Sequence, residues 1–396
     1  MKVKRTARVA TAVALTSAAM VGALLTAGAE SPAFATPHGT GHPPSSADRL
    51  QTAVNDLHAL GITGVQGHRR IGNRTSTATS GVADLDTEAP VPANGHLRIG
   101  SETKTFVVVT LLQLVGEKRL SLDDSVEHWL PGVVSGAGND GRTITVRQVL
   151  QHTSGLADYL DYVPLLRSEE NFRADRFDHH DVADLVAIAM AHPPKFVPGA
   201  KWSYSNTNYL LAGMIIGKVT GHSWSDEVRA RILKPLSLRQ TYFPGDDPTI
   251  RSPHTKGYHQ FVPDGPLVDT TEFNPTIADA TGSLVSTPAD LDRFWQAVQT
   301  GRLLTPALMK QMHETIPAPE IADALPGAQY GLGIYRVADS CGGYWSHPGN
   351  VPGMTVLNGI SADGKRSVAL FLNTSLANPI PVYQRATQFI DETLCR

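Results

Sequence analysis

The sequence of 396 residues has little cysteine, few aromatic residues and no strong excess of charge of either sign. It contains two cysteines, and 34 Lys+Arg against 37 Asp+Glu give a net charge of −3. Without a basic excess there is no electrostatic footprint for nucleic acid, so we expect no nucleic-acid partner. Hydrophobic residues at 41% and charged residues at 18% are ordinary for a globular protein and exclude wholesale disorder.

Several motifs of well-known chemistry are missing. The sequence has no C-x-x-C and no H-E-x-x-H. Zinc chemistry therefore has no support, and we expect neither a metal nor another cofactor. A G-x-S-x-G motif is also absent, which disfavours the nucleophile elbow of the α/β-hydrolases.

The N-terminus has the order of a secretory signal. Basic residues crowd the first eight positions, an apolar run follows to about residue 27, and Ala33-Phe34-Ala35 is a small-x-small site. This order predicts a signal peptide over residues 1–35 and a secreted, extracellular protein. The alternative is an uncut membrane anchor, since the run is long enough to span a bilayer. No later segment approaches that length, so we expect no membrane span after cleavage.

The rest of the chain predicts one catalytic domain after a flexible leader. Residues 36–46 are rich in Gly, Pro, Ser and Thr, which is typical of a linker. Apolar residues three and four apart predict a first helix over 47–60. Strand-like runs at 354–360 and 366–373 surround Asp363-Gly364, which indicates a hairpin.

These elements predict an α/β (α+β) fold with an antiparallel sheet flanked by the N- and C-terminal helices. The last helix should cover about 382–394. A mostly helical lobe of about residues 111–289 should be inserted into a sheet lobe of about residues 47–110 and 290–396. A cleft between two such lobes is where a small-molecule site is expected.

Ser101-Glu102-Thr103-Lys104 is the first candidate site. Residues three apart share a helix face, so the hydroxyl of Ser101 and the amine of Lys104 can meet. A lysine in the first turn opposes the helix dipole, and the following run, apolar nearly all round, should bury it; both effects lower its pKa. A neutral Lys104 can then take the proton of Ser101. The simpler interpretation is a surface lysine in the first helical turn.

Two further candidates follow along the chain. In Tyr204-Ser205-Asn206 an extended backbone would point Tyr204 and Asn206 to one side, for proton relay and for binding a substrate amide or Lys104. In Ser346-His347-Pro348-Gly349-Asn350, His347 can act electrostatically, Gly349 lets a ligand approach the backbone, and the N–H of Asn350 can join that of Ser101 in an oxyanion hole. The simpler interpretations are a helix cap and a turn.

Cys341 and Cys395 form an even pair near the end of the chain. In an exported protein such a pair favours a disulfide. Two buried free thiols are the alternative.

The ordered motifs S-x-x-K, Y-x-N and H-x-G resemble the Tyr-x-Asn branch of the penicillin-recognising serine hydrolases. This branch includes class C β-lactamases, related esterases and secreted serine D-alanyl-D-alanine carboxypeptidases, and the likeness to the last group runs from about residue 97 to 395. The resemblance implies a β-lactamase/transpeptidase-like fold. It also implies Ser101 as the acylated nucleophile, Lys104 as its base, Tyr204 as proton shuttle, Asn206 as substrate-amide contact and His347 in place of the third-motif lysine. The cysteine pair matches a disulfide in those peptidases.

The sequence departs from the peptidases where they hold the substrate's terminal carboxylate. Pro348 stands in place of a threonine hydroxyl, Tyr335 stands at the position of an arginine with Arg336 adjacent, and Ile277 replaces a cleft tryptophan. The acylation machinery is retained, whereas recognition of a carboxylate is not assured.

The sequence therefore predicts a secreted serine hydrolase, with D-alanyl-D-alanine carboxypeptidase activity on peptidoglycan stem peptides and reactivity with β-lactams as the leading function. The expected partner is a small peptide or a β-lactam, with peptidoglycan as the source, and the expected state is a monomer. The alternatives are an esterase, a D-amino-acid amidase or a β-lactamase with the same mechanism, and a non-catalytic penicillin or cell-wall binding protein.

Overall fold

The computed structural model describes residues 46–395. The predicted signal peptide and nearly all of the predicted leader lie outside these residues. Within the described part of the chain, no helix has both the length and the apolar character needed to cross a membrane.

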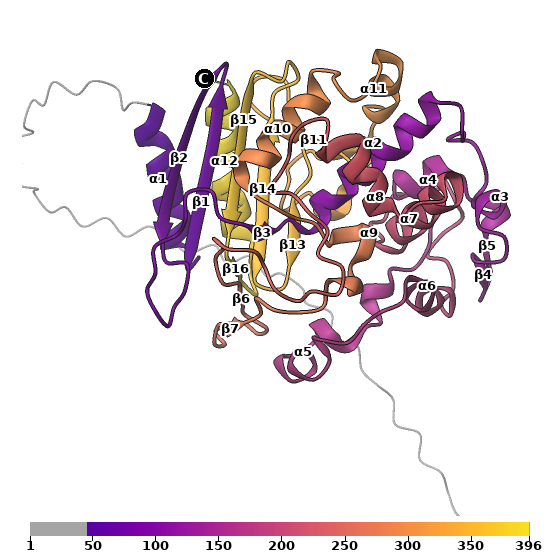
Figure 1. The fold of residues 1–396 in the computed structure, drawn as a ribbon, viewed down its shortest axis with the longest axis horizontal. Coiled ribbons are helices and arrows are strands. Elements are labelled where there is room, and N and C mark those ends of the chain that lie inside the picture. The colour runs from indigo at the N-terminus through magenta and orange to yellow at the C-terminus, as the bar shows by residue number, and fades with distance from the viewer. Residues whose placement is uncertain (1–45, 396) are drawn as a thin grey trace, which may run out of the picture. The chain divides into compact units, whose positions relative to one another are not determined.

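A nine-stranded antiparallel sheet forms one side of the described unit (Figure 1). Its order is β2-β1-β15-β14-β12-β11-β10-β9, with β13 paired to β14. The strands are β1 (Gly64–Ile71), β2 (Arg74–Gly81), β9 (Ile316–Pro317), β10 (Gln329–Tyr330), β11 (Tyr335–Val337), β12 (Tyr344–Ser346), β13 (Gly349–Val351), β14 (Met354–Ile360) and β15 (Arg366–Leu372). The predicted hairpin is confirmed as β14 and β15, paired from Thr355–Leu372 to Ile360–Ser367.

Helices cover both faces of this sheet. The terminal helices α1 (Ser46–Ala59) and α12 (Ile380–Cys395) pack together on one face, as predicted, and α10 (Pro288–Gln299) packs against β1 and β15. Every residue of β14 is buried. The sequence of β14 is therefore a nearly continuous apolar run without alternation, because neither face of the strand is exposed to water.

The remaining helices are grouped beside the sheet as a helical segment (Figure 1). They are α2 (Thr103–Gly116), α3 (Val126–Trp129), α4 (Val146–Leu150), α5 (Glu169–Asp175), α6 (Val182–Met190), α7 (Thr207–Thr220), α8 (Trp224–Val228), α9 (Asp279–Gly282) and α11 (Pro306–Met312). Most of them lie within the predicted lobe of residues 111–289, but α2 begins before it and α11 follows it. Short strands brace them: β3 (Leu97–Arg98) with β8 (Val285–Ser286), β4 (Ser135–Gly136) with β5 (Asn139–Asp140), and β6 (Tyr258–His259) between β7 (Val268–Asp269) and β16 (Thr374–Ser375).

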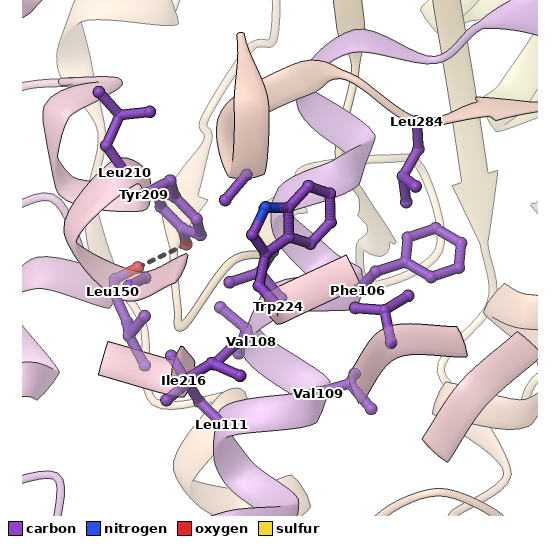
Figure 2. Close-up of a cluster of buried hydrophobic side chains, with 14 of the residues drawn as sticks. Phe106, Val108, Val109, Leu111, Leu150, Tyr209, Leu210, Ile216, Trp224 and Leu284 are labelled. Atoms are coloured by element: carbon purple, nitrogen blue, oxygen red, sulfur yellow. Dashed lines mark hydrogen bonds between the residues drawn. The ribbon is translucent and has the colours of Figure 1, made fainter. Parts of the chain in front are cut away.

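Helix α2 is the centre of the helical segment. Eleven of its residues are buried, from Thr103 to Leu114, which explains why its sequence is apolar nearly all round. It packs against α7, α8 and α9. Figure 2 shows this core, with the hydroxyl of Tyr209 donating to the carbonyl of Leu150 at 2.9 Å. The packing fixes the one helix that carries Lys104.

The two cysteines are joined. Cys341, in the loop between β11 and β12, forms a disulfide with Cys395 at the end of α12. This confirms the predicted pairing and ties the last helix to the sheet. Besides these two sulfurs and Asp339, the described residues contain no cluster of three potential metal ligands.

Candidate active site

Ser101 lies in a single turn of 3-10 helix, Gly100–Glu102, that leads directly into α2. The turn is pressed against strand β13. A Cβ atom at Gly100 would lie 2.6 Å from the backbone nitrogen of Asn350, and Gly100 has a φ of 50°, so only glycine fits there. The close approach places the backbone of Asn350 beside the nucleophile candidate.

Lys104 is fully buried one turn later on α2. Its Nζ lies 3.0 Å from Ser101 Oγ and donates to the Oδ1 of Asn206 at 2.8 Å and the carbonyl oxygen of Thr281 at 2.8 Å. Burial lowers the pKa of Lys104 to about 7, although the nearby carboxylate of Asp158 acts in the opposite direction.

The three contacts of Nζ suit an uncharged amine. Asn206 Oδ1 and the Thr281 carbonyl can only accept hydrogen bonds, and they use the two N–H groups that a neutral amine has. The remaining lone pair then faces Ser101 Oγ. The arrangement is that of a base poised to accept the serine proton.

Tyr204 completes a triangle around the serine oxygen. Its hydroxyl donates to Ser101 Oγ at 2.9 Å, and Lys104 Nζ lies 4.9 Å from the centroid of its ring. Burial raises the pKa of Tyr204 well above its usual value, and neighbouring Tyr335 adds to the effect. The phenol is therefore protonated at neutral pH and can donate a proton to a leaving group.

Asn206 is the N-cap of α7, but its side chain does not cap the helix. It contacts Lys104 instead, and its Nδ2 donates to Asp158 Oδ2 at 2.8 Å while its backbone N–H donates to the same oxygen at 3.0 Å. These bonds fix which end of the amide faces Lys104. Burial raises the pKa of Asp158, whereas the N–H groups of Asn206 and Leu160 lower it.

His347 lies in the third motif and is buried. Its Nδ1 is 2.9 Å from the carbonyl oxygen of Pro348, and its Nε2 is 3.2 Å from the hydroxyl of Tyr330. Burial, reinforced by Lys104, lowers the pKa of His347 to about 3. The imidazole is thus neutral near pH 7, and any electrostatic contribution it makes comes from its dipole and not from a full charge.

Gly349 and Asn350 form the strand edge next to Ser101. A Cβ atom at Gly349 would lie 1.9 Å from the carbonyl oxygen of Ile99, so a side chain has no room there. Val351 and Met354 pair across a two-residue turn, which makes Asn350 and Thr355 a non-hydrogen-bonded pair and points the N–H of Asn350 away from β14. The N–H of Asn350 and that of Ser101 are therefore available to hold one oxyanion, as the sequence predicts.

A cavity of about 660 Å³ opens in front of Ser101. Tyr204, Asn206, His347 and Asn350 line it beside the serine, and most of the wall is apolar. The apolar contributors are Leu160, Leu165, Leu166, Phe273, Ile277, Ala278, Ile321, Ala324, Leu325, Val351, Pro352, Leu376 and Pro379. Of the described residues that line this cavity, none is Lys, Arg, Asp or Glu.

Strand β11 directs Tyr335 toward the cavity and Arg336, the cation adjacent in sequence, away from it. Tyr335 is buried and faces the cavity, whereas Arg336 donates to the carbonyl of Gly342 and lies 5.6 Å from the centroid of the Trp345 ring. Because successive residues of a strand point to opposite faces, Arg336 cannot replace the missing arginine. A substrate carboxylate would meet only neutral donors here.

The sequence did not indicate two partners of the site. Asp158 holds Asn206 and the Thr281 carbonyl holds Lys104, from positions 48 and 177 residues away along the chain. A lone aspartate in a loop and a backbone carbonyl carry no local signature. The predicted residues that line one cavity, in contrast, are Ser101, Tyr204, Asn206, His347 and Asn350, and Lys104 lies just behind its wall. Gly349 does not line the cavity: the absence of a side chain there makes room for the backbone of Ile99 and not for a ligand.

The fold and the site together define a serine hydrolase of the β-lactamase and penicillin-binding protein superfamily. The sequence profile of the family described as "Beta-lactamase" matches residues 50–392, and the chain belongs to this family.

Two solved structures resemble the protein over nearly their whole length. A D-stereospecific amidohydrolase from Streptomyces sp. is 39% identical with a TM-score of 0.78, covering 83% of this chain and 95% of that one. A D-amino acid amidase from Ochrobactrum anthropi SV3, complexed with L-phenylalanine amide, is 28% identical with a TM-score of 0.75, covering 87% and 98%.

Curated relatives include penicillin-binding protein 4* of Bacillus subtilis (strain 168), which is 27% identical over 292 residues. That alignment covers 70% of this chain but only 60% of the relative. The similarity therefore concerns the domain and does not extend over the whole of that protein.

Proposed function

We propose that the protein is a serine amidohydrolase that acylates at Ser101 and cleaves amides of D-amino acids with apolar side chains. The observation that carries this proposal is the uncharged, apolar wall around a serine with a buried lysine base. Such a wall favours a terminal amide, which carries no carboxylate, over a peptide whose terminal carboxylate must be desolvated. The similarity to a D-stereospecific amidohydrolase and to a D-amino acid amidase supports the same substrate class.

The proposed reaction has two halves. Ser101 Oγ attacks the amide carbon while Lys104 takes its proton, and the N–H groups of Ser101 and Asn350 hold the oxyanion. As the C–N bond breaks, Tyr204 donates its proton to the departing nitrogen and recovers one from Lys104. Ammonia leaves, and water then attacks the acyl-enzyme, returning a proton to Ser101 Oγ and releasing the acid.

D-alanyl-D-alanine carboxypeptidase activity is the second candidate, because the S-x-x-K, Y-x-N and H-x-G order resembles those peptidases. Neutral donors near the cavity, among them the hydroxyls of Thr355 and Tyr383, are what it would have to use for the carboxylate. The same Ser101 chemistry makes β-lactams expected acylating agents in either case.

A substrate comparison tests the proposal. We expect kcat/KM for D-phenylalaninamide to exceed that for L-phenylalaninamide, and for a peptide ending in D-Ala-D-Ala, by about 100-fold or more. Release of ammonia or of D-alanine is measured, with the Ser101→Ala protein as the control for contaminating enzymes. Faster release of D-alanine from the peptide would replace the amidase proposal with the carboxypeptidase.

The pH dependence follows from Lys104. With a pKa of about 7, the base is protonated and inactive in acid, so we expect kcat/KM to fall about tenfold per pH unit below pH 7 and to level off above it. p-Nitrophenyl acetate is a suitable substrate because it does not titrate itself. His347, with a pKa of about 3, stays neutral across this range and does not contribute the inflection. A flat profile from pH 5 to 8 would contradict the role of Lys104.

Export is also part of the proposal. A disulfide between Cys341 and Cys395 is typical of an oxidising compartment, which agrees with the predicted signal peptide. N-terminal sequencing of protein recovered from the culture medium tests this, with Thr36 as the expected first residue.

A further inference from the structure

His152 lies directly behind Tyr204 and does not itself line the cavity in front of Ser101. It follows helix α4 in a left-handed backbone conformation, with a φ of 59°, and its side chain is fully buried. Its ring centroid is 4.2 Å from that of Tyr204, with the planes tilted by 34°. The imidazole therefore forms the surface on which the phenol ring rests.

His152 also forms hydrogen bonds to the backbone on both sides of Tyr204. Its carbonyl oxygen accepts from the N–H of Ser203 at 3.0 Å, and its Nδ1 accepts from the N–H of Ser205 at 3.2 Å. Nδ1 lies 3.1 Å from Asn208 Nδ2 as well, in the first turn of α7. Both residues that flank Tyr204, Ser203 and Ser205, are thus hydrogen-bonded to His152.

This arrangement leaves one nitrogen of the His152 ring without a hydrogen-bond partner among the described residues. Because Nδ1 accepts, the proton of the neutral imidazole sits on Nε2, which is buried with no hydrogen-bond partner among the described residues. An unsatisfied buried donor is unfavourable, whereas Nδ1 on the other side of the ring satisfies the N–H of Ser205 and contacts Asn208. Retaining a histidine here indicates that the accepting nitrogen serves the site.

A second aromatic contact links this group to the third motif. The His152 ring lies 4.9 Å from that of Tyr330, whose hydroxyl is 3.2 Å from Nε2 of His347. One buried imidazole therefore packs against Tyr204 and against the tyrosine that contacts His347.

From this geometry we propose that His152 is a positioning residue, which holds the hydroxyl of Tyr204 on Ser101 Oγ without touching the substrate. The inference rests on the proposed role of Tyr204 as proton donor. A general acid displaced by about 1 Å loses on the order of 100-fold in rate.

The test is a double-mutant cycle with Tyr204. His152→Phe keeps an aromatic ring and removes the accepting nitrogen, and we expect kcat to fall about 100-fold while KM changes by less than about threefold. His152→Asn retains an acceptor and tolerates the left-handed backbone, so we expect it to stay within about tenfold of the parent. In a Tyr204→Phe background, His152→Phe should change kcat by no more than about threefold, because the group it positions is gone.

The activities are normalised to the folded fraction from near-ultraviolet circular dichroism. His313→Asn is the matched control, since His313 also stacks on an aromatic ring, that of Trp345 at 3.8 Å, but lies outside the cavity wall. It should leave kcat within about twofold. An equal loss from His152→Phe in both backgrounds, or a loss that disappears after normalisation, would overturn the inference and leave the mechanism standing. Full activity of Tyr204→Phe alone would instead refute the proposed mechanism.

Discussion

Replacing Ser101 by alanine is expected to lower kcat by about 10⁴-fold or more, and replacing Lys104 by methionine should cost nearly as much. The two act as a unit, because without the amine there is no acceptor for the serine proton at 3.0 Å. Steady-state hydrolysis of D-phenylalaninamide gives kcat. Mass mapping after incubation with a labelled penicillin gives the acylated residue, which should be Ser101.

Methionine at position 104 separates catalysis from folding. It fills nearly the volume of the lysine side chain and removes a buried amine whose desolvation disfavours its charged form. Against this gain, Asn206 Oδ1 and the Thr281 carbonyl lose their donor. The thermal midpoint should therefore change little while activity is lost. Lys310→Met, on an exposed lysine of α11, is the matched control and should change neither. Activity retained by Lys104→Met, or a penicillin adduct on another residue, is the result that excludes the mechanism.

Local signals are sufficient to predict two of the helix starts. Thr145 and Gln148 form the capping box that their spacing predicts, and the Thr287 side chain accepts from the N–H of Asp290 ahead of α10. These are short-range hydrogen bonds between residues three apart, so the sequence contains all of their participants. The terminal hairpin was found for the same reason.

The first hairpin, β1 and β2, could not be predicted in this way. β1 carries His68, Arg69 and Arg70 in a nearly buried strand, which no alternating pattern describes. Arg70 is accommodated because its guanidinium donates to Asp292 of α10 at 2.9 Å, 222 residues away. Buried charge is tolerated when it is paired, and the partner comes from the tertiary fold.

The features of the active site also differ in whether they depend on local sequence or on tertiary contacts. The spacing of Ser101 and Lys104 on one helix face is local and predicts their contact, and the apolar run that follows predicts the burial of the amine. The direction of the Asn206 amide depends on Asp158, and the uncharged cavity depends on Tyr335 facing inward from β11. These features decide which substrate fits, so the mechanism is more accessible from sequence than the specificity is.

Replacing Gly349 by alanine should reduce kcat by about 100-fold or more, the second largest effect that we expect. The added Cβ would lie 1.9 Å from the carbonyl oxygen of Ile99, and that atom belongs to the backbone of the turn that carries Ser101. Strand β13 must therefore move away from the turn, and the N–H of Asn350 moves with it. Loss of one oxyanion donor costs on the order of 10²- to 10³-fold in kcat.

Gly217→Ala is the matched control for this change. Gly217 lies in α7, and its Cβ would meet nothing closer than the carbonyl of His222 at 3.7 Å, an ordinary contact. Alanine there should leave kcat unchanged and stabilise the helix by up to about 1 kcal/mol.

The displacement of strand β13 in Gly349→Ala has a further consequence. Acylation by a labelled penicillin should slow as much as amide hydrolysis, since both reactions pass through an oxyanion at the same place. If folded Gly349→Ala protein acylates at the parent rate, the N–H of Asn350 is not the second donor.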